Sequence, residues 1–181
     1  MRFTRPNQSA AEGFSLIELL AVLAIVAVVA ALGAPPLGDW LAEQRMRADL
    51  AALARDFHFA RHEAAKRNVT VSLCASNDAV SCSGSRTWSA GWIVFANLDG
   101  DRPASRDQGE PLLVVRQQTA RNRIVSNRAD FQLRGDLRRA TNGTVLACHT
   151  KRRIAPRALV ISYTGRPRSV RGNPSRSLAC D

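Results

Sequence analysis

The chain has 181 residues, 45% of them hydrophobic, and a formal net charge of +11 with a pI near 11.2. This length suits one anchor segment and one compact domain, and the hydrophobic content excludes a chain too polar to build a core. Aromatic residues are only 6%, so the core must consist mostly of Val, Leu, Ile and Ala.

The charge is unevenly distributed. Residues 1–110 hold 11 basic and 12 acidic side chains, whereas residues 111–180 hold 15 basic side chains and two acidic ones. A genome rich in arginine codons would add arginine throughout the chain, but it would not remove the acids from one part. The asymmetry therefore favours an anionic ligand for the C-terminal part, because guanidinium groups pair well with phosphate.

The N-terminus begins with a polar leader, residues 1–13, followed by an apolar run over residues 14–34 with one charge, Glu18. As a helix the apolar run spans roughly 30 Å, the thickness of a bilayer core. A secretory signal would place its cleavage site after the apolar run, whereas here the polar leader ends before it. We therefore expect a membrane helix over residues 14–36, with the basic leader on the cytoplasmic side.

The residues at the junction, Gly-Phe-Ser-Leu-Ile-Glu at 13–18, resemble the type III signal sequence of type IV pilins and type II secretion pseudopilins. The resemblance implies that prepilin peptidase cleaves between Gly13 and Phe14 and that Phe14 is then N-methylated. It also implies that the Glu18 carboxylate meets the N-terminal amine of a neighbouring subunit in the filament. A charge in a membrane helix is costly, which fits such a role.

An amphipathic helix is predicted over residues 37–67, after Pro35 and Pro36, which should kink the helix or loosen a turn. Its apolar residues recur every three to five positions. They are Leu37, Leu41, Met46, Leu50, Leu53, Phe57 and Ala60.

From residue 68 to 181 the pattern changes to short β runs separated by turns, which predicts a β-rich head with Trp92 in its core. A hairpin is expected around Asn127 and Arg128. The strands are expected at residues 69–75, 91–96, 112–117, 123–126, 129–133, 143–148 and 158–163. One long helix followed by a small antiparallel β-rich head gives an α+β fold.

The Gly-Trp-Ile-Val-Phe run at 91–95 and the Asp- and Gly-rich turn at 97–101, together with the leader, resemble the GspH/FimT family of minor pseudopilins. The resemblance implies a type IV pilin-like fold, no enzymatic activity, and major and minor pilins as partners. No catalytic triad spacing or phosphate-binding glycine loop occurs in the sequence, so neither catalytic residues nor a cofactor are expected.

Four cysteines allow three pairings, and an even count in an exported chain suggests two disulfides. We favour Cys74–Cys82, which brackets a short turn-like stretch, and Cys148–Cys180, which would tie the C-terminus to a core strand. Zinc is the competing interpretation, but the usual C-x-x-C spacing is absent, so no metal is expected.

A basic loop is predicted after the last of these strands, at residues 164–172. Pro167 favours an extended backbone before it, which puts Arg166 and Arg168 on one side, about 7 Å apart. This spacing matches successive phosphates of a nucleic acid. Further candidate contacts are Arg171, Arg176 and the run Lys151, Arg152 and Arg153.

The Gly-Arg-x-Arg pattern at 165–168 resembles the DNA-binding tail of FimT-type minor pilins. The resemblance implies a minor pilin that binds extracellular DNA through Gly165, Arg166 and Arg168 during natural transformation. The predicted partner is duplex DNA, held by its phosphate backbone. The expected location is the inner membrane, single-pass, with a periplasmic head that becomes extracellular in the pilus. Two alternatives remain: a GspH-like pseudopilin of a type II secretion system, and a structural priming subunit.

Overall fold

The structure, a computed structural model, describes residues 13–117, 122–136, 139–149, 154–175 and 177–180, with the backbone alone at residues 32–36. The chain divides into two compact units, Met1–Trp40 and Leu41–Asp181. The first contains the N-terminal part of the helix α1 (Leu16–Arg67), and the second contains the rest of α1 and all the strands.

In the first unit, Ser15 caps the start of α1. Its side-chain oxygen accepts a hydrogen bond from the backbone N–H of Glu18 at 3.3 Å. The pattern of Ser followed three residues later by Glu is that of a capping box. The large apolar side chains between Phe14 and Val29 are exposed. Among the described residues, no helix meets the combined length and hydropathy criteria for a membrane span.

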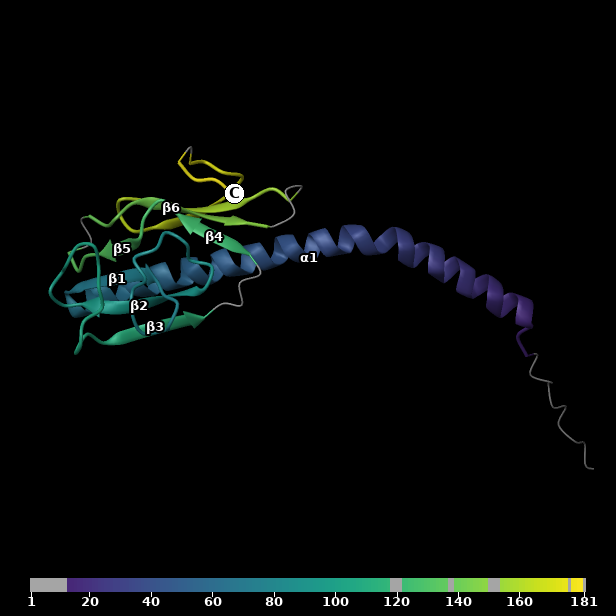
Figure 1. Ribbon diagram of the computed structural model, residues 1–181, viewed down its shortest axis with the longest axis horizontal. Helices are drawn as coiled ribbons and strands as arrows, with labels where there is room; N and C mark the ends of the chain where they lie inside the picture. Colours follow the sequence, from purple (N-terminus) through teal and green to yellow (C-terminus); the bar gives the residue numbers. More distant parts are fainter. Residues whose placement is uncertain (1–12, 118–121, 137–138, 150–153, 176, 181) are drawn as a thin grey trace, which may run out of the picture. The chain divides into compact units, whose positions relative to one another are not determined.

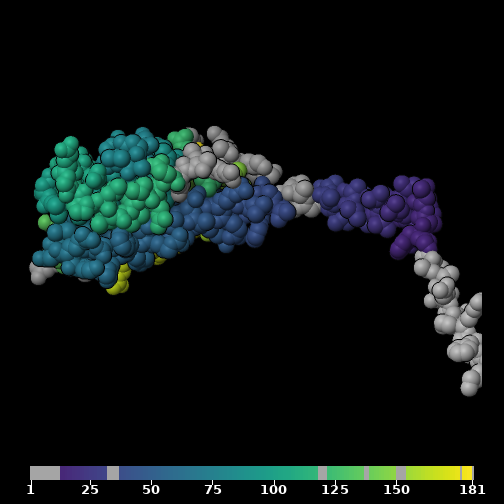
Figure 2. Space-filling view, turned by 90° about the horizontal axis from the view of Figure 1, so that it is seen from below, coloured from purple at the N-terminus to yellow at the C-terminus, as the bar shows by residue number. Residues whose placement is uncertain are grey.

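In the second unit, α1 runs alongside the strands (Figure 1). It buries a regular stripe of side chains in the core that it shares with them. The stripe consists of Met46, Leu50, Leu53, Phe57, Ala60 and Ala64. Of the apolar residues predicted for this face, Leu37 and Leu41 are exposed, so the stripe begins later than expected. The opposite face of α1 stays open along the head (Figure 2). The helix ends at Arg67 and is followed by Asn68, whose φ of 54° is the left-handed conformation that commonly closes a helix.

Two antiparallel four-stranded sheets complete the head. The first has the order β3-β2-β1-β5 and the second the order β4-β6-β7-β8. The first sheet comprises β1 (Thr70–Ala75), β2 (Gly91–Asn97), β3 (Leu112–Gln117) and β5 (Asp130–Leu133). The second comprises β4 (Arg123–Ser126), β6 (Gly143–Cys148), β7 (Arg157–Ile161) and β8 (Pro167–Arg171).

The hairpin expected around Asn127 and Arg128 is wrong. Strand β4 pairs with β6 and strand β5 pairs with β1, so the two strands lie in different sheets. A two-residue hairpin turn favours residues with positive φ, usually including glycine, and this segment has none. Instead Asn127 bonds to Thr144: its N–H donates to the Thr144 carbonyl, and its Oδ1 accepts from the Thr144 N–H.

The largest core cluster lies between α1 and both sheets. Phe131 of β5 stands at its centre, with its ring edge-on to Phe57 of α1 at 5.1 Å and to Trp88 at 5.8 Å between centroids. Trp92 is fully buried, as expected. The aromatic rings join the helix to the first sheet, and the second sheet adds aliphatic side chains such as Ile124 and Leu159 to the same cluster, so both sheets share one core with the helix.

Two disulfides are present, Cys74–Cys82 and Cys148–Cys180, which is the pairing that the sequence favoured. The second joins the C-terminal segment to β6. Leu178 of that segment packs on a small cluster of Val125, Leu146, Cys148 and Ala158. The C-terminal segment therefore covers the side of the second sheet that faces away from the helix.

Candidate nucleic-acid interface

The arginine-rich segment is a strand, and not the loop that the sequence predicted. Residues Pro167–Arg171 form β8, which pairs antiparallel with β7 at the edge of the second sheet. Proline cannot donate a ladder hydrogen bond, but it is tolerated as the first residue of an edge strand. Pro167 occupies that place, so it does not prevent the pairing.

A tight turn connects β7 to β8. Within it the N–H of Gly165 donates to the Ser162 carbonyl at 2.9 Å, and the N–H of Ser162 donates to the Arg166 carbonyl at 3.1 Å. Gly165 is buried and has a φ of 72°, and a Cβ there would lie 2.4 Å from Cδ2 of Leu133. The positive φ and close packing at Gly165 therefore favour glycine in this turn, and its role in binding remains a prediction.

Strand alternation divides the three predicted arginines between two faces. Val170 lies opposite Ala158, whose side chain belongs to the face covered by the C-terminal segment, so Arg168 lies on that outer face as well. Arg166 is two residues before Arg168, so in an extended backbone its side chain points to the same face. Arg171 lies opposite Arg157, whose guanidinium bonds to Glu43 of α1, so Arg171 is on the helix side.

All three arginines, Arg166, Arg168 and Arg171, are exposed. None of them forms an ion pair with a carboxylate in the part of the chain that the structure describes. By contrast, the hydrogen bonds from Arg157 and Arg47 lower the pKa of Glu43 below its ordinary value. The head thus contains paired structural arginines beside α1 and unpaired arginines along β8.

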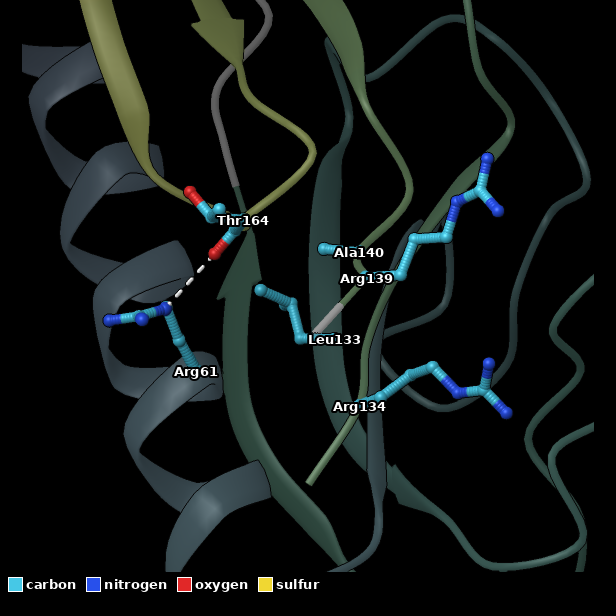
Figure 3. A pocket seen from close by; sticks show the side chains of 6 residues that line it. All are labelled: Arg61, Leu133, Arg134, Arg139, Ala140 and Thr164. Carbon is cyan, nitrogen blue, oxygen red and sulfur yellow. Dashed lines mark hydrogen bonds between the residues drawn. The ribbon is translucent and has the colours of Figure 1, made fainter. Parts of the chain in front are cut away.

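Three further arginines lie around a hollow near the β7–β8 turn, and sequence reasoning missed them. The hollow is lined by Arg61, Leu133, Arg134, Arg139, Ala140 and Thr164 (Figure 3). Arg61 comes from α1, Arg134 follows β5, and Arg139 precedes β6. No local pattern could have revealed them, because only the pairing of distant segments brings them together.

The remaining predicted site residues fall into two sets. Lys151, Arg152, Arg153 and Arg176 lie outside the described residues. Gly13 and Phe14 are exposed at the start of the first unit, and the N–H of Glu18 takes part in the helix cap. The roles of Gly13, Phe14 and Glu18 in processing and assembly remain predictions.

The basic part of the chain forms the second sheet, so the positive charge is concentrated in one part of the head. All four strands of the second sheet come from residues 123–171, which belong to the basic part of the chain. The acids cluster in α1 and in the β2–β3 connection instead. An anion approaching the outer side of the second sheet therefore meets mostly positive charge.

A long N-terminal helix packed on antiparallel sheets defines a protein of the type IV pilin fold. The model of the family described as "Type II transport protein GspH" matches residues 49–172, more than half of the chain, so the chain belongs to the GspH family. A model of the prokaryotic N-terminal methylation motif matches residues 8–34. The resemblance predicted from the leader and the head is therefore confirmed.

The solved structures that resemble this chain include two crystal forms of the type IV minor pilin FimU from Pseudomonas aeruginosa. One has 17% identity and a TM-score of 0.53, covering 71% of this chain and 90% of FimU. The other has 18% identity and a TM-score of 0.50, covering 70% and 91%. These likenesses support the fold alone. No curated protein matches the chain.

The family and the methylation motif together make this chain a minor pilin or pseudopilin, a membrane-anchored subunit that associates with other pilins. Such a protein is structural and non-enzymatic in kind.

Proposed function

We propose that this minor pilin binds duplex DNA without sequence specificity, through arginines on the outer side of its second sheet, and serves DNA uptake in natural transformation. The observation that carries the proposal is the pair Arg168 in edge strand β8 and Arg166 directly before it, both exposed and unpaired with any described carboxylate. Two residues along a strand are about 7 Å apart, the separation of successive phosphates.

The mechanism is electrostatic. Each arginine that contacts a phosphate releases condensed counterions, so affinity falls as salt rises. If four to six phosphates are engaged, log K should fall with log salt at a slope of roughly −4 to −5. Contacts to phosphate position the protein but do not read bases, so the binding should not depend on sequence.

In this proposal the chain matures as its leader implies. Prepilin peptidase removes residues 1–13, Phe14 becomes the methylated N-terminus, and Glu18 pairs with a neighbouring amine in the filament. Residues 14–36 anchor the chain as a single pass of the inner membrane, residues 37–67 continue as the amphipathic helix, and the head, residues 68–181, lies in the periplasm until assembly carries it outward.

The test is a salt titration of the full chain in detergent with a fluorescent duplex, followed by anisotropy. Arg166→Ala/Arg168→Ala should weaken binding and reduce the magnitude of the slope by about 2. Arg45→Ala/Arg102→Ala removes the same charge from exposed positions on α1 and the β2–β3 connection, and should change the slope little. Unchanged binding by the first variant, or an equal loss in the second, contradicts the proposal.

A second candidate is a pseudopilin of a type II secretion system, which the family description favours. In that role the unpaired arginines would pair with acidic groups of neighbouring subunits. Cells carrying Arg166→Ala/Arg168→Ala separate the two roles: DNA uptake predicts normal piliation with lost transformation, whereas the pseudopilin role predicts a secretion defect with transformation unaffected.

A further inference from the structure

The β7–β8 turn is fastened to two other parts of the head. The Nε of Arg61 in α1 donates to the Thr164 carbonyl at 3.0 Å (Figure 3). On the other side, the N–H of Ala140 donates to the Tyr163 carbonyl at 2.7 Å. Gly165 packs closely on Leu133, since a Cβ there would lie 2.4 Å from Cδ2 of Leu133. The turn is therefore held in place, and the arginine that follows it starts from a fixed position.

The same contacts bring Arg134 and Arg139 beside the turn. Arg134 follows Leu133 at the end of β5, and Arg139 precedes Ala140. Both are exposed, and their side chains project in the same direction, away from Arg61 (Figure 3). Within the described ranges, neither forms an ion pair with a carboxylate. Two pairs of free guanidinium groups thus flank one ordered turn.

We propose that Arg134 and Arg139 form one phosphate-binding surface with Arg166 and Arg168, so that the DNA backbone crosses the β7–β8 turn. This inference rests on the proposed function. The pairs come from segments about 30 residues apart in the chain, joined by the hydrogen bond between Ala140 and Tyr163. Groups that are already fixed lose less freedom on binding, so a surface assembled in this way binds more tightly than a mobile tail with the same charges.

The experiment extends the salt titration of the full chain in detergent to two pairs of substitutions and their combination. Arg134→Ala/Arg139→Ala should reduce the magnitude of the slope of log K against log salt by about 2, as Arg166→Ala/Arg168→Ala does. The quadruple variant should show a reduction equal to the sum of these two reductions. A wild-type slope for Arg134→Ala/Arg139→Ala, with a reduced slope for Arg166→Ala/Arg168→Ala, would overturn this inference and leave DNA binding intact. No binding by the unmodified chain would remove both.

A charge-preserving variant excludes an indirect effect. Arg134→Lys/Arg139→Lys keeps both cations and should keep the wild-type slope. If the lysine variant loses as much slope as the alanine variant, the arginines act by supporting the fold, and the inference fails.

The fixed turn has its own test. Gly165→Ala retains every arginine but puts a Cβ 2.4 Å from Cδ2 of Leu133 at a φ of 72°, so the turn or Leu133 must shift. We expect weaker binding than wild type at low salt with the folded head retained, as judged by circular dichroism. Binding equal to wild type would show that the position of the turn does not matter, which contradicts a preformed surface.

Discussion

Asp56 joins α1 to two strands of the first sheet. Its Oδ2 accepts hydrogen bonds from Nε1 of Trp92 at 2.9 Å and from Nε of Arg116 at 3.1 Å, and its Oδ1 accepts from Nη2 of Arg116. The carboxylate is buried, whereas the Arg116 side chain is 46% exposed. The ion pair therefore orients the helix against the first sheet. The buried Asp56 carboxylate is stabilised by the hydrogen bonds that Trp92 and Arg116 donate to it.

Asp56→Ala should lower the free energy of unfolding by about 1–3 kcal/mol, because the buried Trp92 N–H is left without a partner. Denaturant unfolding of the chain in detergent measures the change. Asp107→Ala, at an exposed loop position, is the matched control and should stay within about 0.5 kcal/mol. Equal effects of the two substitutions would show that the buried network contributes nothing.

Asp130 gives the head a pH dependence. Burial raises the pKa of its carboxyl above the ordinary 3.8, although a hydrogen bond from the Ala104 backbone opposes this. Folding thus favours the protonated form, so the contribution to stability is present below pH 3.8 and is lost as the pH rises through the folded pKa.

Asp130→Asn removes the charge that burial disfavours while keeping an acceptor. We expect a higher melting temperature than wild type at pH 7 and no gain at pH 3, because wild-type Asp130 is then protonated. Thermal melts followed by circular dichroism at both pH values measure this. A gain of the same size at pH 3 would point to a cause other than ionisation.

At the scale of elements, the local pattern predicted α1 and most strands. The apolar stripe from Met46 to Ala60 has helical spacing, and the runs of β-branched residues mark the strands. The sequence could not predict which strands pair, because pairing depends on contacts far apart in the chain. The expected β4–β5 hairpin failed for this reason.

The candidate site was predictable only where it is continuous in sequence. Arg166 and Arg168 stood out as a short pattern. Strand β8 was expected to be a loop because Gly165 precedes it and Pro167 is its first residue. Arg134 and Arg139 carried no signal at all, since they join the site through the backbone contact between Ala140 and Tyr163.

The two disulfides should stabilise the head to different extents. The Cys148–Cys180 bridge closes 32 residues and the Cys74–Cys82 bridge closes eight. The chain-entropy estimate gives about 3.7 kcal/mol for the longer loop and about 2.5 kcal/mol for the shorter one. We therefore expect Cys148→Ser/Cys180→Ser to lower the unfolding free energy more than Cys74→Ser/Cys82→Ser, measured in denaturant. The reverse order would mean that packing around the shorter loop outweighs loop closure.

At the scale of the whole molecule, we expect Glu18 to affect filaments and not the head. Glu18→Ala should be cleaved normally but recovered less in sheared pilus fractions, because the proposed partner amine loses its counter-charge. The Ser15→Ala variant is the control, since it removes the helix cap and keeps the carboxylate. Immunoblots of the sheared pilus fraction and of the remaining cells measure the outcome for each variant. An equal loss in both variants would assign the effect to helix capping.

Strand β8 leaves one row of backbone N–H and C=O groups facing outward at the margin of its sheet. Such a margin can template the addition of a strand from another molecule, and charged side chains are a common safeguard against it. The positive charges of Arg166, Arg168 and Arg171 therefore also oppose edge-to-edge pairing between the β8 strands of two identical heads. Removal of these charges favours aggregation of the subunits, so light scattering should accompany every binding measurement on the alanine variants.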